Sequence, residues 1–209
     1  MPHNPITRIT FDDTMLCVGW ADGLELRQHL TRFDRLREAS AAQRADFQII
    51  DEGTSVVWPH LATDGVTIDG IDWIWEHLCN QSLGRLHALE WHLDQVSAKD
   101  QAIVALWRLE ADGYNGGFLQ FFCNWGDPTY DLAVAALQAI GAERTRELVS
   151  RQRQLIDHLD GHPQLKELWD IPGLLSDDEH ELISVELDAK LWDVAMEIPA
   201  LAVRHFYPG

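Results

Sequence analysis

The chain has 209 residues with an ordinary apolar fraction of 46% and nine tryptophans, enough for one large domain or two small ones with a sizeable core. This composition excludes a disordered chain. The sequence holds 34 acidic and 16 basic residues, and its formal net charge is −18. Because phosphates would be repelled, this charge argues against direct binding to nucleic acid or to an anionic membrane. It favours a basic protein partner.

The sequence has no run of about 18 apolar residues, and its first residues lack the charged and apolar regions of a signal peptide. We therefore expect a soluble, cytoplasmic protein. Cys17, Cys79 and Cys123 are far apart and form no CxxC pair. We expect them to be small buried side chains rather than parts of a disulfide framework or a zinc site.

The first third of the chain predicts a small α+β domain over residues 1–69. Short β-prone runs separated by Asp and Gly turns over residues 6–28 are typical of an antiparallel meander. Residues 33–45 have helical spacing. The runs FQIID and TSVVWP then predict two more strands, joined by a tight turn at Glu52 and Gly53.

From residue 70 nearly to the end, the apolar residues have the spacing of α-helices. Residues 70–209 therefore predict an all-helical domain, and the whole chain predicts an α+β fold. This second part carries most of the charge, with 23 acids and 10 bases against 11 and 6 in residues 1–69. Gly84 is a candidate break in its first helix, and Gly141 has the position of a C-terminal helix cap.

The stretch from Tyr114 to Asp127, YNGGFLQFFCNWGD, carries the sharpest backbone signal. Gly116 and Gly117 indicate a tight turn between two helices, where Asn115 can serve as a cap. Gly126 predicts the end of the second helix, after which Asp127 and the following proline predict a restart. The aromatic residues between the breaks predict one buried helix face at i, i+3, i+4 and i+7: Phe118, Phe121, Phe122 and Trp125.

Two interpretations of this stretch stay open. In the first, it is a helical corner around which the later helices pack. In the second, it forms a small-ligand pocket, since convergent polar groups beside apolar side chains are typical of such sites. The polar residues of this pocket would be Asn115, Gln120, Asn124 and Asp127.

The N-terminal meander, the helix after it and an acidic, isoleucine-containing stretch after a WP pair resemble a small bacterial domain family of unknown function. The resemblance covers about residues 6–75 and implies a fold without a chemistry. The residues of that stretch are Trp58, Pro59, Asp64, Ile68 and Asp69.

The run NGGFLQFFCNWGD, followed by AALQAIGA and later by LWDVAMEIPALAVRHF, resembles the C-terminal domain family named after an acidic DNA-mimic protein of bacteria. The resemblance covers about residues 70–209 and implies a helical fold, with DNA mimicry as the function attached to the family name. The chain departs from the namesake by carrying an N-terminal module. The matching residues are Asn115, Gly116, Gly117, Phe118, Gln120, Phe121, Phe122, Asn124, Ile140, Gly141 and Ala142.

A DNA mimic places carboxylates where phosphates would lie, so that a protein evolved to bind DNA binds the mimic instead. A capping box at Ser176 and Glu179 predicts a long helix that runs to about Glu197. Helical spacing sends several of its acids to a common solvent face, although such acids can also serve solubility alone. The predicted acidic interaction surface consists of Asp177, Asp178, Glu179, Glu181, Glu186, Asp188, Asp193 and Glu197.

The sequence contains no GxSxG, P-loop, HExxH or dinucleotide-binding motif. His158 and His162 are four residues apart, but the intervening glycine and the proline that follows would break a shared helix. We therefore expect no catalytic residue, no metal and no cofactor. The leading hypothesis is a non-enzymatic protein that binds a basic partner, with a DNA-binding regulator as the candidate. The alternatives are a small-molecule binding protein or enzyme that uses the pocket around Asn115, and a homodimer in which the N-terminal module adapts or dimerises the helical one.

Overall fold

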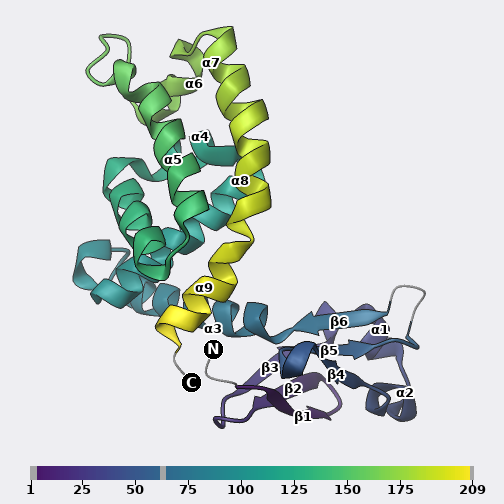
Figure 1. Cartoon of the computed structure of the whole chain (residues 1–209). Helices are drawn as coiled ribbons and strands as arrows, with labels where there is room; N and C mark the ends of the chain where they lie inside the picture. The colour runs from purple at the N-terminus through teal and green to yellow at the C-terminus, as the bar shows by residue number, and fades with distance from the viewer. Residues whose placement is uncertain (1–3, 62–64, 208–209) are drawn as a thin grey trace. The chain divides into compact units, whose positions relative to one another are not determined.

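The computed structural model describes residues 4–61 and 65–207 (Figure 1), so Asp64 of the N-terminal resemblance lies outside the described residues. The chain divides into two compact units. One unit holds the residues up to His77 together with the last residues from Tyr207, and the other is Leu78–Phe206. All six strands described belong to the first unit and the second is helical, which confirms the α+β fold.

The first unit contains two antiparallel three-stranded sheets, in the orders β1-β2-β3 and β4-β5-β6. The meander and the two later strands are confirmed, whereas β6, which has four residues, was not predicted. The strands are β1 Ile6–Phe11, β2 Met15–Trp20, β3 Glu25–His29, β4 Gln48–Ile50, β5 Ser55–Trp58 and β6 Val66–Asp69. The helices are α1 Asp34–Glu38, α2 Ala41–Ala45 and the beginning of α3 Gly70–Ala88.

Short polar residues and glycines shape the turns between these strands. Asp12 Oδ1 accepts hydrogen bonds from the backbone N–H groups of Thr14 at 2.9 Å and Met15 at 2.8 Å, which closes the turn between β1 and β2. Between β4 and β5, three consecutive residues ending at Gly53 have positive φ. A Cβ on Gly53 would lie 2.4 Å from Pro5 Cβ, so this tight turn requires glycine.

The core of the first unit is centred on Trp58 of β5, which is fully buried. Its Nε1 donates to the carbonyl oxygen of Arg44 at 2.8 Å, so its one polar atom is satisfied. The ring packs edge-on against Phe11 of β1, with 6.1 Å between centroids. The aromatic side chain therefore links the two sheets.

Two helix predictions need correction. The helix predicted over residues 33–45 is the pair α1 and α2, because Ser40 starts α2 with its own capping box. The break predicted at Gly84 is wrong, since α3 continues through it to Ala88. A single glycine inside a helix costs only about 1 kcal/mol, which packing can offset.

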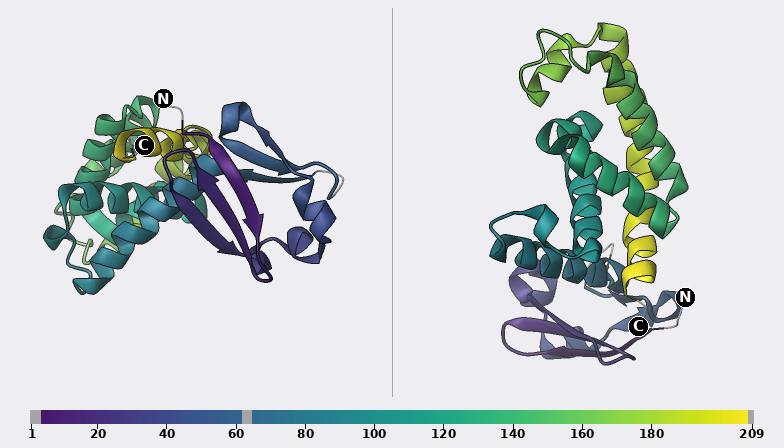
Figure 2. Two further views of the ribbon diagram at one scale, coloured as in Figure 1. Left: turned by 90° about the horizontal axis from the view of Figure 1, so that it is seen from below. Right: turned by 90° about the vertical axis from the view of Figure 1, so that its left-hand side faces the viewer.

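The second unit is built around α4, which two glycine breaks divide. Thr145 near the start of α5 donates to the carbonyl oxygen of Val194 at 3.3 Å, and Gln152 near its end donates to Asp188 at 2.6 Å, so α5 runs antiparallel to α8 (Figure 2). Gly141 closes α4 in the left-handed conformation predicted for a C-terminal cap. Besides the end of α3, the helices are α4 Ala98–Ile140, α5 Glu143–Ile156, α6 Ile171–Leu174, α7 Asp177–Glu181, α8 Asp188–Ala195 and α9 Glu197–Phe206.

The long helix predicted after Ser176 is present as α7, a π-helical segment at Leu182–Leu187, and α8. Ser176 N–H donates to the Glu179 carboxylate at 2.9 Å, and Ser176 Oγ accepts from Glu179 N–H at 3.4 Å, which confirms the capping box. The π-helical segment has a wider turn than an α-helix, so it shifts the phase of the residues that follow.

A buried carboxylate joins α3 to the first turn of α4. Asp100 is only 5% exposed and accepts hydrogen bonds from Ser82 Oγ at 2.8 Å, Ser97 Oγ at 2.7 Å and Arg85 Nη2 at 2.6 Å. Burial alone would raise the pKa of Asp100. The hydrogen bonds, that from Arg85 first among them, outweigh burial and lower the pKa to about 2.

We expect Asp100→Asn to destabilise the second unit by roughly 2 kcal/mol near neutral pH, since hydrogen bonds to charged groups contribute about 1.5–3 kcal/mol each. The folded pKa lies below the ordinary value of 3.8, so this stabilisation is present above about pH 4 and is lost as pH falls toward 2. Urea unfolding of both proteins at neutral and acid pH measures the difference. If the difference in unfolding free energy between the two proteins stays constant with pH, the stabilising role of the Asp100 carboxylate is contradicted.

Candidate functional site

The break in α4 occurs at the predicted glycine pair. Gly117 has φ 78° and ψ −172°, a conformation that residues with a Cβ rarely adopt, whereas Gly116 has a negative φ of −157° with ψ 18°. The helix restarts at Phe118, whose N–H has no partner within the new helix. It donates instead to Asp188 Oδ1 at 3.0 Å. The cap of the restarted helix is therefore supplied by α8 rather than by Asn115.

Asp188 lies in the interior, and its predicted place on the acidic surface is wrong. It is 3% exposed, and its Oδ1 also accepts from Gln152 Nε2 on α5 at 2.6 Å. Burial raises the pKa of Asp188, and the hydrogen bonds from Phe118 and Gln152 offset this only in part. One carboxylate thus connects α4, α5 and α8.

The sequence missed this role for two reasons. Carboxylates are rarely buried, so an acid in a helical pattern is assigned to solvent by default. The π-helical segment Leu182–Leu187 just before Asp188 also breaks the 3.6-residue period on which the assignment was based. Gln152 was missed as well, although it lies on the buried face of α5 between Val149 and Ile156.

The aromatic face predicted after the break is mostly confirmed. Trp125 is the exception, with 36% of its surface exposed. The Arg108 guanidinium lies 3.6 Å from the centre of the Trp125 ring, and Trp125 Nε1 donates to Asp112 at 2.6 Å. Gly126, with φ 64°, breaks the helix directly after it, as predicted. The buried rings are Phe118, Phe121 and Phe122.

The polar residues of the predicted pocket do not converge on one cavity. Asn115 and Asn124 are exposed to solvent. Gln120 Nε2 donates to Asp112 at 2.9 Å. The crevice next to the glycine break is lined by other residues, including Tyr114, and is too narrow for a water molecule. This geometry favours the helical-corner interpretation of the stretch.

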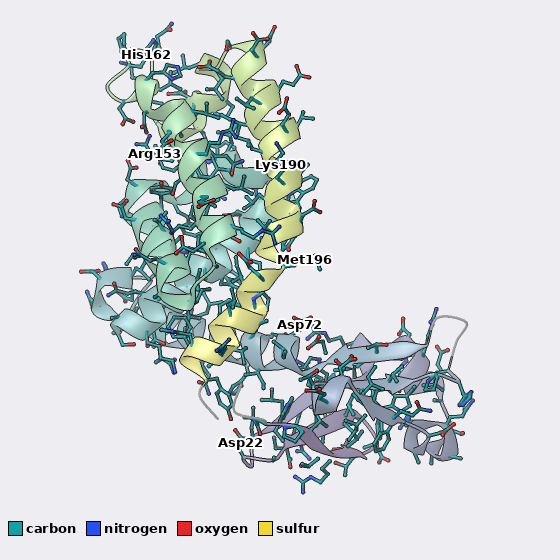
Figure 3. All side chains as sticks on the ribbon, in the orientation of Figure 1. Asp22, Asp72, Arg153, His162, Lys190 and Met196 are labelled. Atoms are coloured by element: carbon teal, nitrogen blue, oxygen red, sulfur yellow. The ribbon has the colours of Figure 1, made fainter. Side chains whose placement is uncertain are left out.

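The fourth polar residue of that set, Asp127, belongs to an ion-pair cluster around Arg153 of α5, which Figure 3 labels. Arg153 Nε lies 3.0 Å from Asp127, and its other nitrogens pair with Asp157 and with Asp160 at 3.1 Å. The guanidinium lies 4.9 Å from the centre of the Phe122 ring. The single positive charge of Arg153 is therefore shared among three acids, and its pair with Asp127 joins α5 to α4.

Most of the predicted acidic surface is exposed on α7, the π-helical segment and α8. Glu179 is half-buried in the capping box, and Glu197 accepts from Thr145 Oγ1 at 2.8 Å, so both have structural partners. We call the remaining exposed acids the acidic face: Asp177, Asp178, Glu181, Glu186 and Asp193.

An open groove of about 430 Å³ between α5 and α8 borders the acidic face. Lys190, labelled in Figure 3, is one of three basic residues that line this groove. The groove therefore does not continue the acidic face. The groove is lined by Arg144, Glu147, Leu148, Arg151, Lys190, Asp193 and Val194.

The described residues include no group of three or more His, Cys, Asp or Glu side chains placed to hold a metal ion. None of the helices described is long and apolar enough to cross a membrane. Cys17, Cys79 and Cys123 are buried, as predicted, and they form no disulfide with one another. Burial raises the pKa of Cys123 to about 11, which disfavours the reactive thiolate.

Gly117→Ala is expected to destabilise the second unit by more than about 3 kcal/mol, because the positive φ is strained and the Asp188 contact must break. The new Cβ would lie 1.9 Å from Asp188 Oδ2. Gly116→Ala is the matched control, since its φ is negative and the atom nearest to its new Cβ is at the movable end of Gln120. Thermal unfolding of both variants measures the contrast, and equal effects would contradict the role assigned to Gly117.

Asp188→Asn is expected to raise stability at neutral pH, because it keeps the carbonyl acceptor and removes a buried charge. The folded pKa of Asp188 is raised, so the folded state loses stability as pH rises above the ordinary value of 3.8. The advantage of the variant should therefore shrink below about pH 4. Asp188→Ala, which leaves Phe118 N–H and Gln152 unpaired, should destabilise at every pH. If unfolding curves at neutral pH show that Asp188→Asn is less stable than the unmodified chain, this prediction is refuted.

Family models match both parts of the chain and confirm the two resemblances. A model described as a protein of unknown function (DUF2442) matches residues 6–71, and a DMP19-like protein model matches residues 94–205. Searches of curated proteins and of solved structures found no significant match. The second model covers more than half of the chain, including the glycine break of α4 and the helix that carries Asp188, and the chain belongs to the DMP19-like protein family.

Proposed function

We propose that this chain is a non-enzymatic interaction protein whose acidic face binds a basic protein. The observation that carries the proposal is the set of exposed carboxylates along α7, the π-helical segment and α8. The ion pairs of the described residues use other acids, such as Asp100 and Asp127. None of the ion pairs among the described residues involves an acid of the acidic face, and the nearest group of bases, Arg144, Arg151 and Lys190, lines the groove beside Asp193.

Electrostatics favours such a partner. Residues 70–209 carry 23 acids and 10 bases, so like charges repel one another across the helical part. A basic protein relieves this repulsion and is attracted from a distance. The attraction acts through water, so added salt should weaken it.

The acids are held on a fixed scaffold. The Ser176 capping box holds the start of α7, and Asp188 joins α8 to α4 and α5. Fixed carboxylates lose less conformational entropy on binding than a mobile acidic tail would.

These features support the finer proposal that the partner is a DNA-binding regulator and that the acidic face mimics DNA phosphates. Membership of the DMP19-like family adds support, because the chain resembles the family named after an acidic DNA-mimic protein. The small-ligand alternative gains no comparable support, since Asn115 and Asn124 face solvent and Gln120 pairs with Asp112.

The test is capture from a bacterial lysate by the immobilised full chain at low and moderate salt, with captured proteins identified by mass spectrometry. We expect a basic DNA-binding protein that is released at moderate salt and competed off by DNA. The acidic-face variant should lose it. That variant carries Asp177→Asn, Glu181→Gln, Glu186→Gln and Asp193→Asn.

The matched control removes the same number of charges from exposed acids of the first unit. It should capture the partner as the unmodified chain does. Salt-independent capture, or equal loss in the two variants, would contradict the proposal. The control carries Asp13→Asn, Glu38→Gln, Asp46→Asn and Glu52→Gln.

A further inference from the structure

Exposed apolar side chains gather on α8, on the residues directly before and after it, and on the adjoining end of the first α4 segment. Met196, labelled in Figure 3, is 72% exposed, Val185 is 61% exposed, and Tyr114 and Trp192 are each 45% exposed. Ala189 is exposed between them. We call this set the Trp192 face: Tyr114, Val185, Ala189, Trp192 and Met196.

The helical members form one line along the helix. Val185, Ala189, Trp192 and Met196 occur at i, i+4, i+7 and i+11, and helical residues three or four positions apart are surface neighbours. Tyr114 joins them from α4. Its hydroxyl donates a long hydrogen bond of 3.4 Å to the carbonyl oxygen of Trp192.

Hydrogen bonds also fix the largest ring of this face. Trp192 Nε1 donates to the carbonyl oxygen of Gly113 at 2.7 Å, which holds the indole against α4 while nearly half of its surface stays in water. A ring held in this way loses little freedom when a partner covers it. Trp, Tyr and Met are also the residues enriched at the centres of protein interfaces.

The acidic face borders the Trp192 face on the same helix. Glu186 directly follows Val185 and Asp193 directly follows Trp192, so these acids form a row about 100° around the helix from the apolar row, with Lys190 between them. Exposed apolar patches rimmed by polar residues mark sites of protein interaction. A partner segment that matches both rows has its own apolar row, bordered by lysine or arginine.

We propose that the Trp192 face anchors a basic amphipathic segment of the partner, whose lysines or arginines contact the acidic face. This inference rests on the proposed function and adds an apolar requirement to it. A surface that imitated phosphates alone would need no apolar row. A second copy of this chain is a poor occupant, because it would bring another acidic row and a further charge of −18 to the interface.

The two faces have separable effects on binding. The acidic face governs the salt-dependent part, because exposed charges are screened. The Trp192 face supplies a part that persists at high salt, since burial of apolar surface does not depend on charge.

The experiment uses two synthetic peptides with the same lysines at helical spacing, one with leucines on the other face and one with serines in their place. The full chain should bind the leucine peptide about tenfold or more tightly, as expected for burial of one or two apolar side chains. A double variant with Val185→Ser and Met196→Ser should lose most of that preference. Fluorescence anisotropy of labelled peptides measures both affinities.

The matched control is Ile49→Ser with Leu89→Ser, two exposed aliphatic residues outside the face, at 40% and 37% exposure. It should keep the preference, and circular dichroism verifies that both variants are folded. Equal affinity for the two peptides, or a preference that survives in the Val185 and Met196 variant, would overturn the inference. In that case, loss of both peptides by the acidic-face variant would still support the proposed function.

Two further outcomes count against the inference. If neither peptide binds, the inference and the proposed function both fail. If sedimentation shows a dimer that the Val185→Ser and Met196→Ser changes convert to a monomer, a second copy covers the Trp192 face and the proposed occupant is wrong.

Discussion

The helical unit depends on one buried carboxylate. Asp188 accepts the N–H that the glycine break of α4 leaves free at Phe118, and it also accepts the side-chain amide of Gln152 on α5. Three helices from distant parts of the sequence meet at this residue, so the direction in which α8 runs is fixed by it. The surfaces of α8 that face water follow from this arrangement, because the side that carries Asp188 is turned inward.

The acids of the chain therefore fall into two physical classes. Some have partners within the protein: Asp100 accepts hydrogen bonds where α3 meets α4, Asp188 accepts one at the α4 break, and Asp127 pairs with Arg153. Others stay on the solvent side of α7, the π-helical segment and α8, and among the described residues they form no ion pair. Net charge alone cannot separate the two classes. Only the second class can bind a basic partner, which makes the acidic face smaller than the composition suggests.

Much of the fold could be predicted because its signals are local. The glycine pair at Gly116, the cap at Gly141 and the capping box at Ser176 each act within a few residues. The acidic face was only partly predicted, since the interior position of Asp188 depends on a hydrogen-bond partner about 70 residues away and on a π-helical turn. The Trp192 face was not predicted although its helical members have regular spacing, because an apolar row in a helix is normally assigned to the core.

The central claim is that a basic partner binds the helical unit along α7 and α8. Hydrogen–deuterium exchange of the full chain, with and without the basic protein captured at low salt, tests it most directly. Slower exchange should be confined to peptides that cover α7, the π-helical segment and α8, together with the end of the first α4 segment near Tyr114. Slower exchange confined to the strands of the first unit, or none along α7 and α8, would contradict the claim.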